Sequence, residues 1–247
     1  MNQALKDKVA LVMGGTRGIG AAIVRRLARD GAAVAFTYAA SADAAHALAA
    51  DIETEGGQAL AIQADSANPQ AVRHTVAQAA ARFGRIDILV NNAGVLRLGA
   101  IDQMPLEDFD HLYNVNVRGL FVSVQSALAH MPDGGRIISI GSVASVRVAF
   151  PTSSGYAMSK GAVASLVRGM AIDLAPRRIT VNNVQPGPVE TDMNPGDAPH
   201  AEALKGMIPL HRVGQPDEIA AMVAYLAGAE AGYVTGASLL IDGGYSA

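Results

Sequence analysis

A strand, a turn and a helix follow one another in KVALVMGGTRGIGAAIVRRLARDGA, residues 8–32. The segment opens with an apolar run of strand length and passes into a turn rich in glycine. An Ala-rich amphipathic stretch, residues 18–32, then shows the period of a helix and stops at Gly31. The segment therefore predicts a buried strand whose carboxyl end turns directly into a helix.

The same alternation of apolar runs and amphipathic stretches continues along the chain. We expect strands at residues 8–14, 33–38, 58–65, 86–94, 135–142, 179–187 and 238–244, and helices at 18–32, 41–57, 69–83, 106–131, 155–175 and 216–227. Continuous Val, Ile and Leu runs separated by helices indicate a parallel sheet covered on both faces. Right-handed crossovers then give an α/β Rossmann fold, with a doubly wound, mostly parallel sheet of seven strands.

The chain of 247 residues contains no Pro-, Gly- or Ser-rich linker, so we predict a single domain over residues 1–247. The segment 188–215 is long and rich in Pro and Gly. It suits a lid or a loop over a substrate, and a plain surface excursion is the alternative interpretation.

Composition excludes several classes of protein. Half of the residues are apolar and 17% are charged, which suits a globular core. A net charge of −3 without a basic patch argues against nucleic-acid binding. Without cysteine there is no disulfide or thiolate site, and the histidines show no metal-binding spacing, so we expect no metal. The N-terminus reads as neither a signal peptide nor a membrane span, so we expect a cytoplasmic protein that does not bind membranes.

The turn GGTRGIG, residues 14–20, has the spacing Gly14-x-x-x-Gly18-x-Gly20. Glycines between the first strand and the first helix let the backbone approach a pyrophosphate, and the helix directs its N-terminus at the phosphates. The turn therefore predicts dinucleotide binding. A tight turn that binds no ligand is the alternative.

The end of the second strand predicts which dinucleotide is bound. A carboxylate there would accept from the ribose 2′-hydroxyl of NAD, but FTYAAS, residues 36–41, contains none before Asp43. A 2′-phosphate instead requires a cation and hydroxyls, which Arg17 and Ser41 can supply. We infer NADP(H), with a merely solvated Arg17 as the alternative.

Polar and small residues follow the third and fourth strands. NNAG, residues 91–94, allows a ligand to pass close to the carboxyl end of the sheet. Asp65, with Ser66 beside it, can accept from an adenine amino group. Capping of the next helix explains that pair equally well.

SSGYAMSK, residues 153–160, places Tyr156 and Lys160 on one face of an expected helix. A surface i,i+4 pair is the plain interpretation. The chemical interpretation is that an ammonium favours the ionised form of a nearby phenol, which can then exchange a proton near neutral pH. Ser142 ends the fifth strand, and no histidine lies in a motif that would make it a nucleophile. We interpret Ser142 as a hydrogen-bond donor to a carbonyl.

Over essentially its whole length the chain resembles a short-chain dehydrogenase/reductase. The motifs that carry the resemblance are Ser142 and the segments 14–20, NNAG (91–94), NVNVRG (114–119), YAMSK (156–160), PGPVET (186–191), RVGQPDEIA (212–220) and VTGASLLIDGG (234–244). The chain is also similar to a bacterial subgroup labelled as cyclic-di-GMP-binding biofilm dispersal mediators.

The resemblance implies a catalytic set of Asn116, Ser142, Tyr156 and Lys160. Tyr156 would give its proton to the substrate carbonyl oxygen as hydride arrives from the nicotinamide. Ser142 would orient and polarise that carbonyl. Lys160 would act on Tyr156 and hold the nicotinamide ribose, and Asn116 would hold a water that connects Lys160 to solvent.

The expected cofactor site is larger than the catalytic set. Its residues are Gly14, Thr16, Arg17, Gly18, Ile19, Gly20, Tyr38, Ser41, Asp65, Ser66, Asn92, Ala93, Gly94, Tyr156, Lys160, Pro186, Gly187, Val189 and Thr191. By the resemblance, the last four flank the nicotinamide, with Thr191 near its carboxamide.

The resemblance favours an NADPH-dependent reductase that converts a ketone to a secondary alcohol, working as a homotetramer. A 3-oxoacyl-[acyl-carrier-protein] reductase is one alternative, but HMPDGGRI, residues 130–137, offers an acidic carrier only Arg136, with Arg177 and Arg178 further on. A nucleotide-binding regulator without turnover is another. The residues expected around the substrate, at 143–150 and 192–208 with Leu96 and Leu98, are mostly small or apolar and predict an uncharged substrate.

Overall fold

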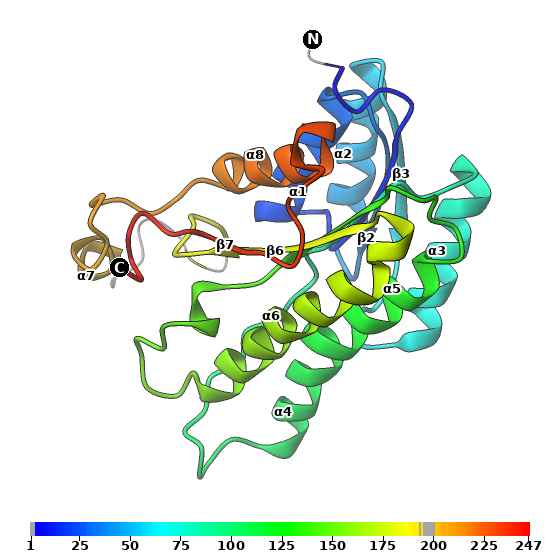
Figure 1. Cartoon of the computed structure of the whole chain (residues 1–247). Helices are drawn as coiled ribbons and strands as arrows, with labels where there is room; N and C mark the ends of the chain where they lie inside the picture. Colours follow the sequence, from blue (N-terminus) through cyan, green and yellow to red (C-terminus); the bar gives the residue numbers. More distant parts are fainter. Residues whose placement is uncertain (1–2, 193, 195–200) are drawn as a thin grey trace.

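A seven-stranded sheet forms the centre of the molecule (Figure 1). The computed structural model describes residues 3–192, 194 and 201–247. Its strands have the order β3-β2-β1-β4-β5-β6-β7, and every pairing between them is parallel. They are β1 Val9–Met13, β2 Ala33–Tyr38, β3 Gln58–Gln63, β4 Ile88–Asn91, β5 Arg136–Ile140, β6 Thr180–Pro186 and β7 Ser238–Ile241. The predicted Rossmann fold is confirmed.

Helices cover both faces of the sheet, as the alternating pattern predicts. They are α1 Gly18–Arg29, α2 Ala42–Thr54, α3 Pro69–Phe83, α4 Leu106–Tyr113, α5 Leu120–Ala127, α6 Ser154–Leu174, α7 Ala201–Gly206 and α8 Pro216–Ala227. Alternate residues of β1 enter different cores. Val12 packs in the core under α1, α2 and α8, whereas Leu11 packs in the core under α3, α5 and α6. Figure 1 shows these two helical layers on opposite sides of the strands.

The strand order reverses at β1, which lies between β2 and β4. The chain leaves β1 toward one layer of helices and β4 toward the other, so the backbone diverges at the carboxyl ends of these strands. Ligands of open parallel sheets bind in the crevice that this divergence creates. Each predicted cofactor motif follows β1, β2, β3, β4 or β6 at this edge. Ser142 follows β5, and Tyr156 and Lys160 lie on α6 beside it.

The predicted helix over residues 106–131 is interrupted. The π-helical segment η1, Asn114–Gly119, joins α4 to α5, and α5 ends at Ala127. Asn116 lies in this segment and is 2% exposed. Its side chain forms hydrogen bonds with the backbone of Val95. Insertion of an extra residue into a helical turn is typical of functional positions. Periodicity did not predict it.

Asp65 and Ser66 do not cap the helix that follows them, so that interpretation is wrong. Asn68 is the N-cap of α3, and its Oδ1 accepts from the N–H of Gln70 at 2.9 Å and of Ala71 at 3.2 Å. Asn68 precedes a proline at the first helical position, a combination that fixes the helix start. The turn before the cap leaves Asp65 exposed at the end of β3.

The two ends of the segment 188–215 lie side by side and are joined by backbone hydrogen bonds. Glu190 N–H donates to Gly214 O at 2.9 Å, and Gly214 N–H donates to Pro188 O at 2.9 Å. The expected lid includes residues 193 and 195–200, which lie outside the described residues. Among residues 3–192, 194 and 201–247, no helix is both long and apolar enough to cross a bilayer, and no group of three or more His, Asp or Glu suits a metal ion.

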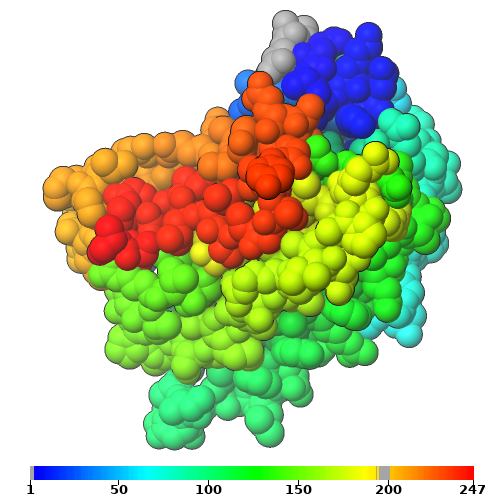
Figure 2. All heavy atoms as spheres, viewed as in Figure 1, coloured from blue at the N-terminus to red at the C-terminus, as the bar shows by residue number. Residues whose placement is uncertain are grey.

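A small third core attaches α7 to the rest of the molecule. Leu204 and Ile208 pack with Val143, which follows β5, and with Tyr245 near the C-terminus. Figure 2 shows the C-terminal segment lying on the surface between residues of the α7–α8 region and the segment after β5. The chain end therefore holds α7 beside the carboxyl edge of the sheet.

The start of α8 is stabilised by a charged network. Arg212 donates to both carboxylate oxygens of Glu218, at 2.7 and 2.8 Å, and the N–H of Gln215 donates to the same carboxylate at 2.8 Å. The bonds from Arg212, followed by the bond from the Gln215 backbone, lower the pKa of Glu218 to about 2. The ionised side chain thus caps the helix.

We predict that Glu218→Gln lowers the melting temperature at pH 7, because the amide cannot replace the charged cap. A carboxyl group whose pKa is depressed by folding stabilises the protein above its unfolded pKa, near 4.5, and loses this effect as the pH falls toward 2. The difference in melting temperature between wild type and variant should therefore shrink below pH 4.5. Thermal melts across this range, with Glu230→Gln as a control, test it. A difference that does not change with pH would contradict the assignment.

Candidate active site

The glycine turn after β1 is packed tightly within the protein itself. Gly14 has φ +80° and donates its N–H to Thr37 Oγ1 at 2.7 Å, while Asn92 Nδ2 donates to Gly14 O at 2.5 Å. A Cβ at Gly20 would collide with that same carbonyl oxygen. Part of the glycine pattern is therefore required by close backbone packing, independent of any ligand.

Gly18 has a different environment and faces the segment after β6. Its φ is +51°, and a Cβ there would lie 3.1 Å from Thr191 Cγ2. The N-terminus of α1, which begins at Gly18, therefore lies beside the PGPVET segment. This brings two predicted cofactor motifs together across the crevice.

Two side chains at this edge remain available for an anion. Arg17 is the N-cap of α1 and Ser41 is the N-cap of α2, and neither side chain makes a capping hydrogen bond. The guanidinium of Arg17 is 66% exposed and lies 3.8 Å from the carboxylate of Asp192, a weak contact. Tyr38, by contrast, is 9% exposed and packs edge-on against His46.

A pocket of about 1190 Å³ opens beside the glycine turn. Thr16, Arg17, Gly18 and Thr191 line it, as the sequence predicts. Glu190 belongs to the predicted PGPVET motif, and Asp192 and Lys205 belong to the segment 192–208 expected around the substrate. The other lining residues were not predicted beside the glycine turn, and they are Ala21, Ala22, Arg25, Val213, Gln215, Pro216 and Asp217. Helical spacing from Gly18 could have identified Ala21, Ala22 and Arg25. Residues 213–217 carry no local signal for this contact, since only the fold brings them there.

Other predicted cofactor residues lie deeper at the same edge. Ser66 and Ala93 border a second, very small cavity together with Met13 and Val115. A Cβ at Gly94 would lie 3.4 Å from Lys160 Nζ and 3.5 Å from Asn116 Oδ1. NNAG therefore connects the glycine turn to the predicted catalytic residues.

Three hydrogen bonds hold the side chain of Asn116 in place. Its Oδ1 accepts from Val95 N–H at 2.8 Å, and its Nδ2 donates to Val95 O and to Ser159 Oγ, both at 3.0 Å. Ser159 in turn donates to Tyr156 O at 2.7 Å. Both amide protons of Asn116 are used, so its side chain fixes the segment after β4 relative to α6.

Lys160 is 6% exposed, and its ammonium lies at the end of β5. Nζ donates to Ile140 O at 3.0 Å and lies 5.8 Å from the centre of the Tyr156 ring. One turn of α6 separates the two residues, so they share a face as the spacing predicts. The partly buried phenol and the buried ammonium therefore lie close together at the carboxyl edge of the sheet.

Ser142 lies two residues beyond the end of β5 and is the N-cap of the 3₁₀ segment η2, Val143–Ser145. Its Oγ accepts from Ala144 N–H at 3.1 Å. This bond uses an acceptor site of the hydroxyl and leaves its proton free to donate. The geometry thus suits the predicted hydrogen-bond donor.

Comparisons with known proteins agree with this arrangement. Residues 14–246 match the family described as Enoyl-(Acyl carrier protein) reductase. A solved short-chain dehydrogenase/reductase from Serratia marcescens BCRC 10948 is 59% identical, with a TM-score of 0.97 over 99% of this chain and 100% of that one. A short chain dehydrogenase from Burkholderia cenocepacia J2315 in complex with NADP is 50% identical, with the same TM-score and coverage.

A curated relative carries a different description. The Cyclic-di-GMP-binding biofilm dispersal mediator protein of Escherichia coli (strain K12) is 46% identical over 244 residues, which cover 99% of each chain. The similarities to oxidoreductases and to this protein extend over nearly the whole length, and both resemblances seen in the sequence are confirmed. The chain belongs to the short-chain dehydrogenase/reductase family of oxidoreductases.

Proposed function

We propose that this chain is an NADPH-dependent carbonyl reductase that converts a ketone to a secondary alcohol, reversibly. The observation that carries the proposal is the buried ammonium of Lys160 beside Tyr156. No ion pair joins Lys160 to a carboxylate within the described residues. An unpaired buried lysine is costly and rare, and such groups mark functional sites.

The residues at the carboxyl edge fit NADP(H). Arg17 and Ser41 supply a cation and a hydroxyl at the ends of neighbouring strands, and no carboxylate follows β2 before Asp43. The Burkholderia relative binds NADP, which supports the same assignment here. When bound, the reduced cofactor supplies the hydride. Pro186, Gly187, Val189 and Thr191 would hold its nicotinamide end.

Tyr156 is the proposed proton donor to the substrate carbonyl oxygen. The ammonium of Lys160 lies 5.8 Å from the centre of its ring, and a phenol held in place can give its proton to the oxygen of a carbonyl that is being reduced. Ser142 directs its free hydroxyl proton at the same oxygen and so stabilises the charge that develops there. Lys160 keeps two further N–H donors after its bond to Ile140 O, enough to meet the ribose hydroxyls.

Asn116 has a narrower role than the family resemblance implies. Both protons of its amide are used within the protein. Any water that it holds must therefore donate to its Oδ1, which retains a second lone pair. We assign Asn116 chiefly to fixing the backbone of Val95 beside Lys160.

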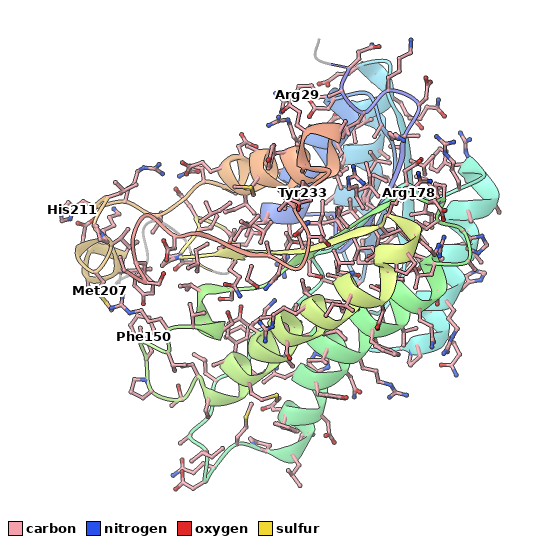
Figure 3. The ribbon with its side chains drawn as sticks, viewed as in Figure 1. Arg29, Phe150, Arg178, Met207, His211 and Tyr233 are labelled. Carbon is pink, nitrogen blue, oxygen red and sulfur yellow. The ribbon has the colours of Figure 1, made fainter. Side chains whose placement is uncertain are left out.

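The proposed substrate is apolar and uncharged around its carbonyl. Leu96, Leu98, Val148 and Phe150 are all more than 40% exposed on two loops that follow β4 and β5. The loops are joined by a bond from Gly99 N–H to Thr152 O at 2.8 Å. Figure 3 shows Phe150 and Met207 on the same side of the molecule, where α7 and the loop after β5 meet.

An acidic carrier protein is less well supported than a free ketone. Arg136 bonds to the carbonyls of Gly134 and Gly135, and burial lowers its pKa. Arg177 pairs with Asp133 at 3.3 Å. Arg178 also lies 4.0 Å from Asp133, so this one carboxylate offsets part of the charge of both arginines and weakens the attraction for an acidic carrier.

A nucleotide-binding regulator is the second candidate. The Escherichia coli relative is described as binding cyclic-di-GMP, and the pocket beside the glycine turn contains the cations Arg17, Arg25 and Lys205. A regulator has no need for Ser142, Tyr156 and Lys160 together. We therefore rank it below the reductase.

We also propose that the single domain assembles as a homotetramer through α4, α5 and α6 and through the C-terminal strand β7. These helices expose the large apolar side chains Leu106, Phe109, Tyr113, Phe121 and Ile172. An exposed apolar face of this size favours association, and self-association with two-fold symmetry is the commonest form.

We predict that Tyr156→Phe lowers kcat by about 10²- to 10⁴-fold, because the variant has no proton to donate. NADPH binding should change little, since the ring and Lys160 remain. The test follows NADPH absorbance with a panel of ketones, 3-oxo esters and a 3-oxoacyl thioester.

Tyr233→Phe is the matched control for this variant. Tyr233 is fully exposed, and its hydroxyl has no role in the proposal. Full activity of Tyr156→Phe would contradict the mechanism. Tight NADPH binding without turnover of any carbonyl by the wild type would favour the regulator, and a cyclic-di-GMP titration would follow.

We predict that Arg17→Ala weakens NADPH binding by about 10- to 100-fold and leaves NADH binding nearly unchanged. The reason is the loss of a charge-assisted contact to the 2′-phosphate, which NADH lacks. Fluorescence titrations of both nucleotides measure this. Arg29→Ala is the control, because Arg29 lies at the far end of α1 (Figure 3). Equal weakening of both nucleotides would contradict the assignment of Arg17.

A further inference from the structure

Gln185 is a buried polar residue that neither the fold nor the proposed mechanism explains. It lies on β6 directly before Pro186 and is 1% exposed. A buried amide is retained only where its groups find partners. Its Nε2 donates to Ser145 Oγ at 2.6 Å, across 40 residues of sequence.

Ser145 is itself hydrogen-bonded to Ser142. Its hydroxyl donates to Ser142 O at 2.9 Å, and its backbone N–H donates to the same carbonyl at 3.1 Å. A serine hydroxyl has one proton. Because that proton is used on Ser142 O, the hydroxyl accepts from Gln185, and the direction of the chain of bonds is fixed.

The consequence is a constraint on Ser142. Its carbonyl is held from one side by Ser145, and its Oγ accepts from Ala144 N–H at 3.1 Å. The residue has extended backbone, with φ −167° and ψ 151°, and cannot rotate without breaking one of these bonds. Its hydroxyl proton is the group left free to point into the crevice.

The hydrogen bond between Gln185 and Ser145 also connects the end of β6 to the segment after β5. Gly141 N–H donates to Val184 O at 2.7 Å, the last backbone bond between the ends of β5 and β6. Beyond this point the two chains separate, toward Ser142 on one side and toward Pro186 on the other. The side-chain bond between Gln185 and Ser145 spans the start of this separation.

We propose that Gln185 and Ser145 are positioning residues that hold the Ser142 hydroxyl in its donor orientation, relative to the segment after β6. This inference rests on the proposed reductase function, in which Ser142 polarises the substrate carbonyl. Bonds in such a chain polarise one another, and a small displacement of a catalytic donor lowers the rate.

Two variants remove the chain of bonds at different points. Ser145→Ala deletes the middle hydroxyl, and Gln185→Met replaces the amide by an apolar side chain of similar length. We expect each to lower kcat and kcat/KM together by about three- to tenfold, the effect of losing one neutral hydrogen bond that acts in the transition state. NADPH affinity should stay within about twofold.

A rescue variant and a double variant distinguish the loss of positioning from a general loss of stability. Ser145→Thr keeps the hydroxyl and should restore most of the rate, and Ser145→Ala with Gln185→Met should be little worse than either alone. Ser126→Ala is the control, because Ser126 donates to Val122 O at 2.8 Å on α5, remote from the crevice. It should leave kcat unchanged.

Hydrogen exchange of residues 141–150, with NADPH bound, provides a readout that does not depend on turnover. Faster exchange in both variants together with lower kcat supports the proposal. Unchanged exchange, or faster exchange with wild-type kcat, overturns it. If the wild type reduces no carbonyl, the reductase proposal fails, and unchanged exchange in the variants would then also refute the constraint on the turn.

Discussion

The hydrogen bonds between the Asn116 side chain and the backbone of Val95 fix the geometry on which the site depends. They require an asparagine inside a helical run, and the helix accommodates it by the π-helical segment between α4 and α5. The same amide reaches Ser159 on α6. Since α6 carries Tyr156 and Lys160, one buried side chain sets the distance between the segment after β4 and the proposed acid. A buried amide with every proton used is expensive to disturb, which makes it a good fixed point.

Parallel strands explain why residues from six regions of the sequence meet. Every strand ends at the same edge, so the residues that follow β1, β4, β5 and β6 become neighbours without long connections. At the glycine turn, packing within the protein and the approach of a ligand both require small residues. The glycines of this turn admit the backbone of Ala93 and the side-chain amide of Asn92. Glycines in such a turn also allow phosphates to approach the backbone. Substitution of a glycine there therefore affects folding and binding together, and loss of binding in such a variant would say little about the ligand.

The sequence was most informative where a period or a spacing has one structural meaning. Seven apolar runs and the helices between them predicted the sheet, and the i,i+4 spacing placed Tyr156 and Lys160 on one face. Contacts between distant residues were not predictable. No local pattern predicts the π-helical turn at Asn116, the bond from Gln185 to Ser145, or the approach of Asp217 to the pocket. The alternative that Asp65 and Ser66 cap α3 was wrong, because Asp65 and Asn68 are both good capping residues and only the backbone distinguishes them.

Membership of the family does not by itself separate an enzyme from a binding protein, since one fold serves many functions. The free-energy cost of burying a charged side chain is more informative. A phosphate-binding crevice needs glycines, helix N-termini and exposed cations such as Arg17, all of which tolerate solvent. Lys160 is different, because desolvating an ammonium against a neutral carbonyl opposes folding. Contacts to the ribose hydroxyls of a nucleotide would use the ammonium alone and would not require a phenol beside it. A protein that moves a proton through Tyr156 uses both groups, which lie 5.8 Å apart from ammonium to ring centre.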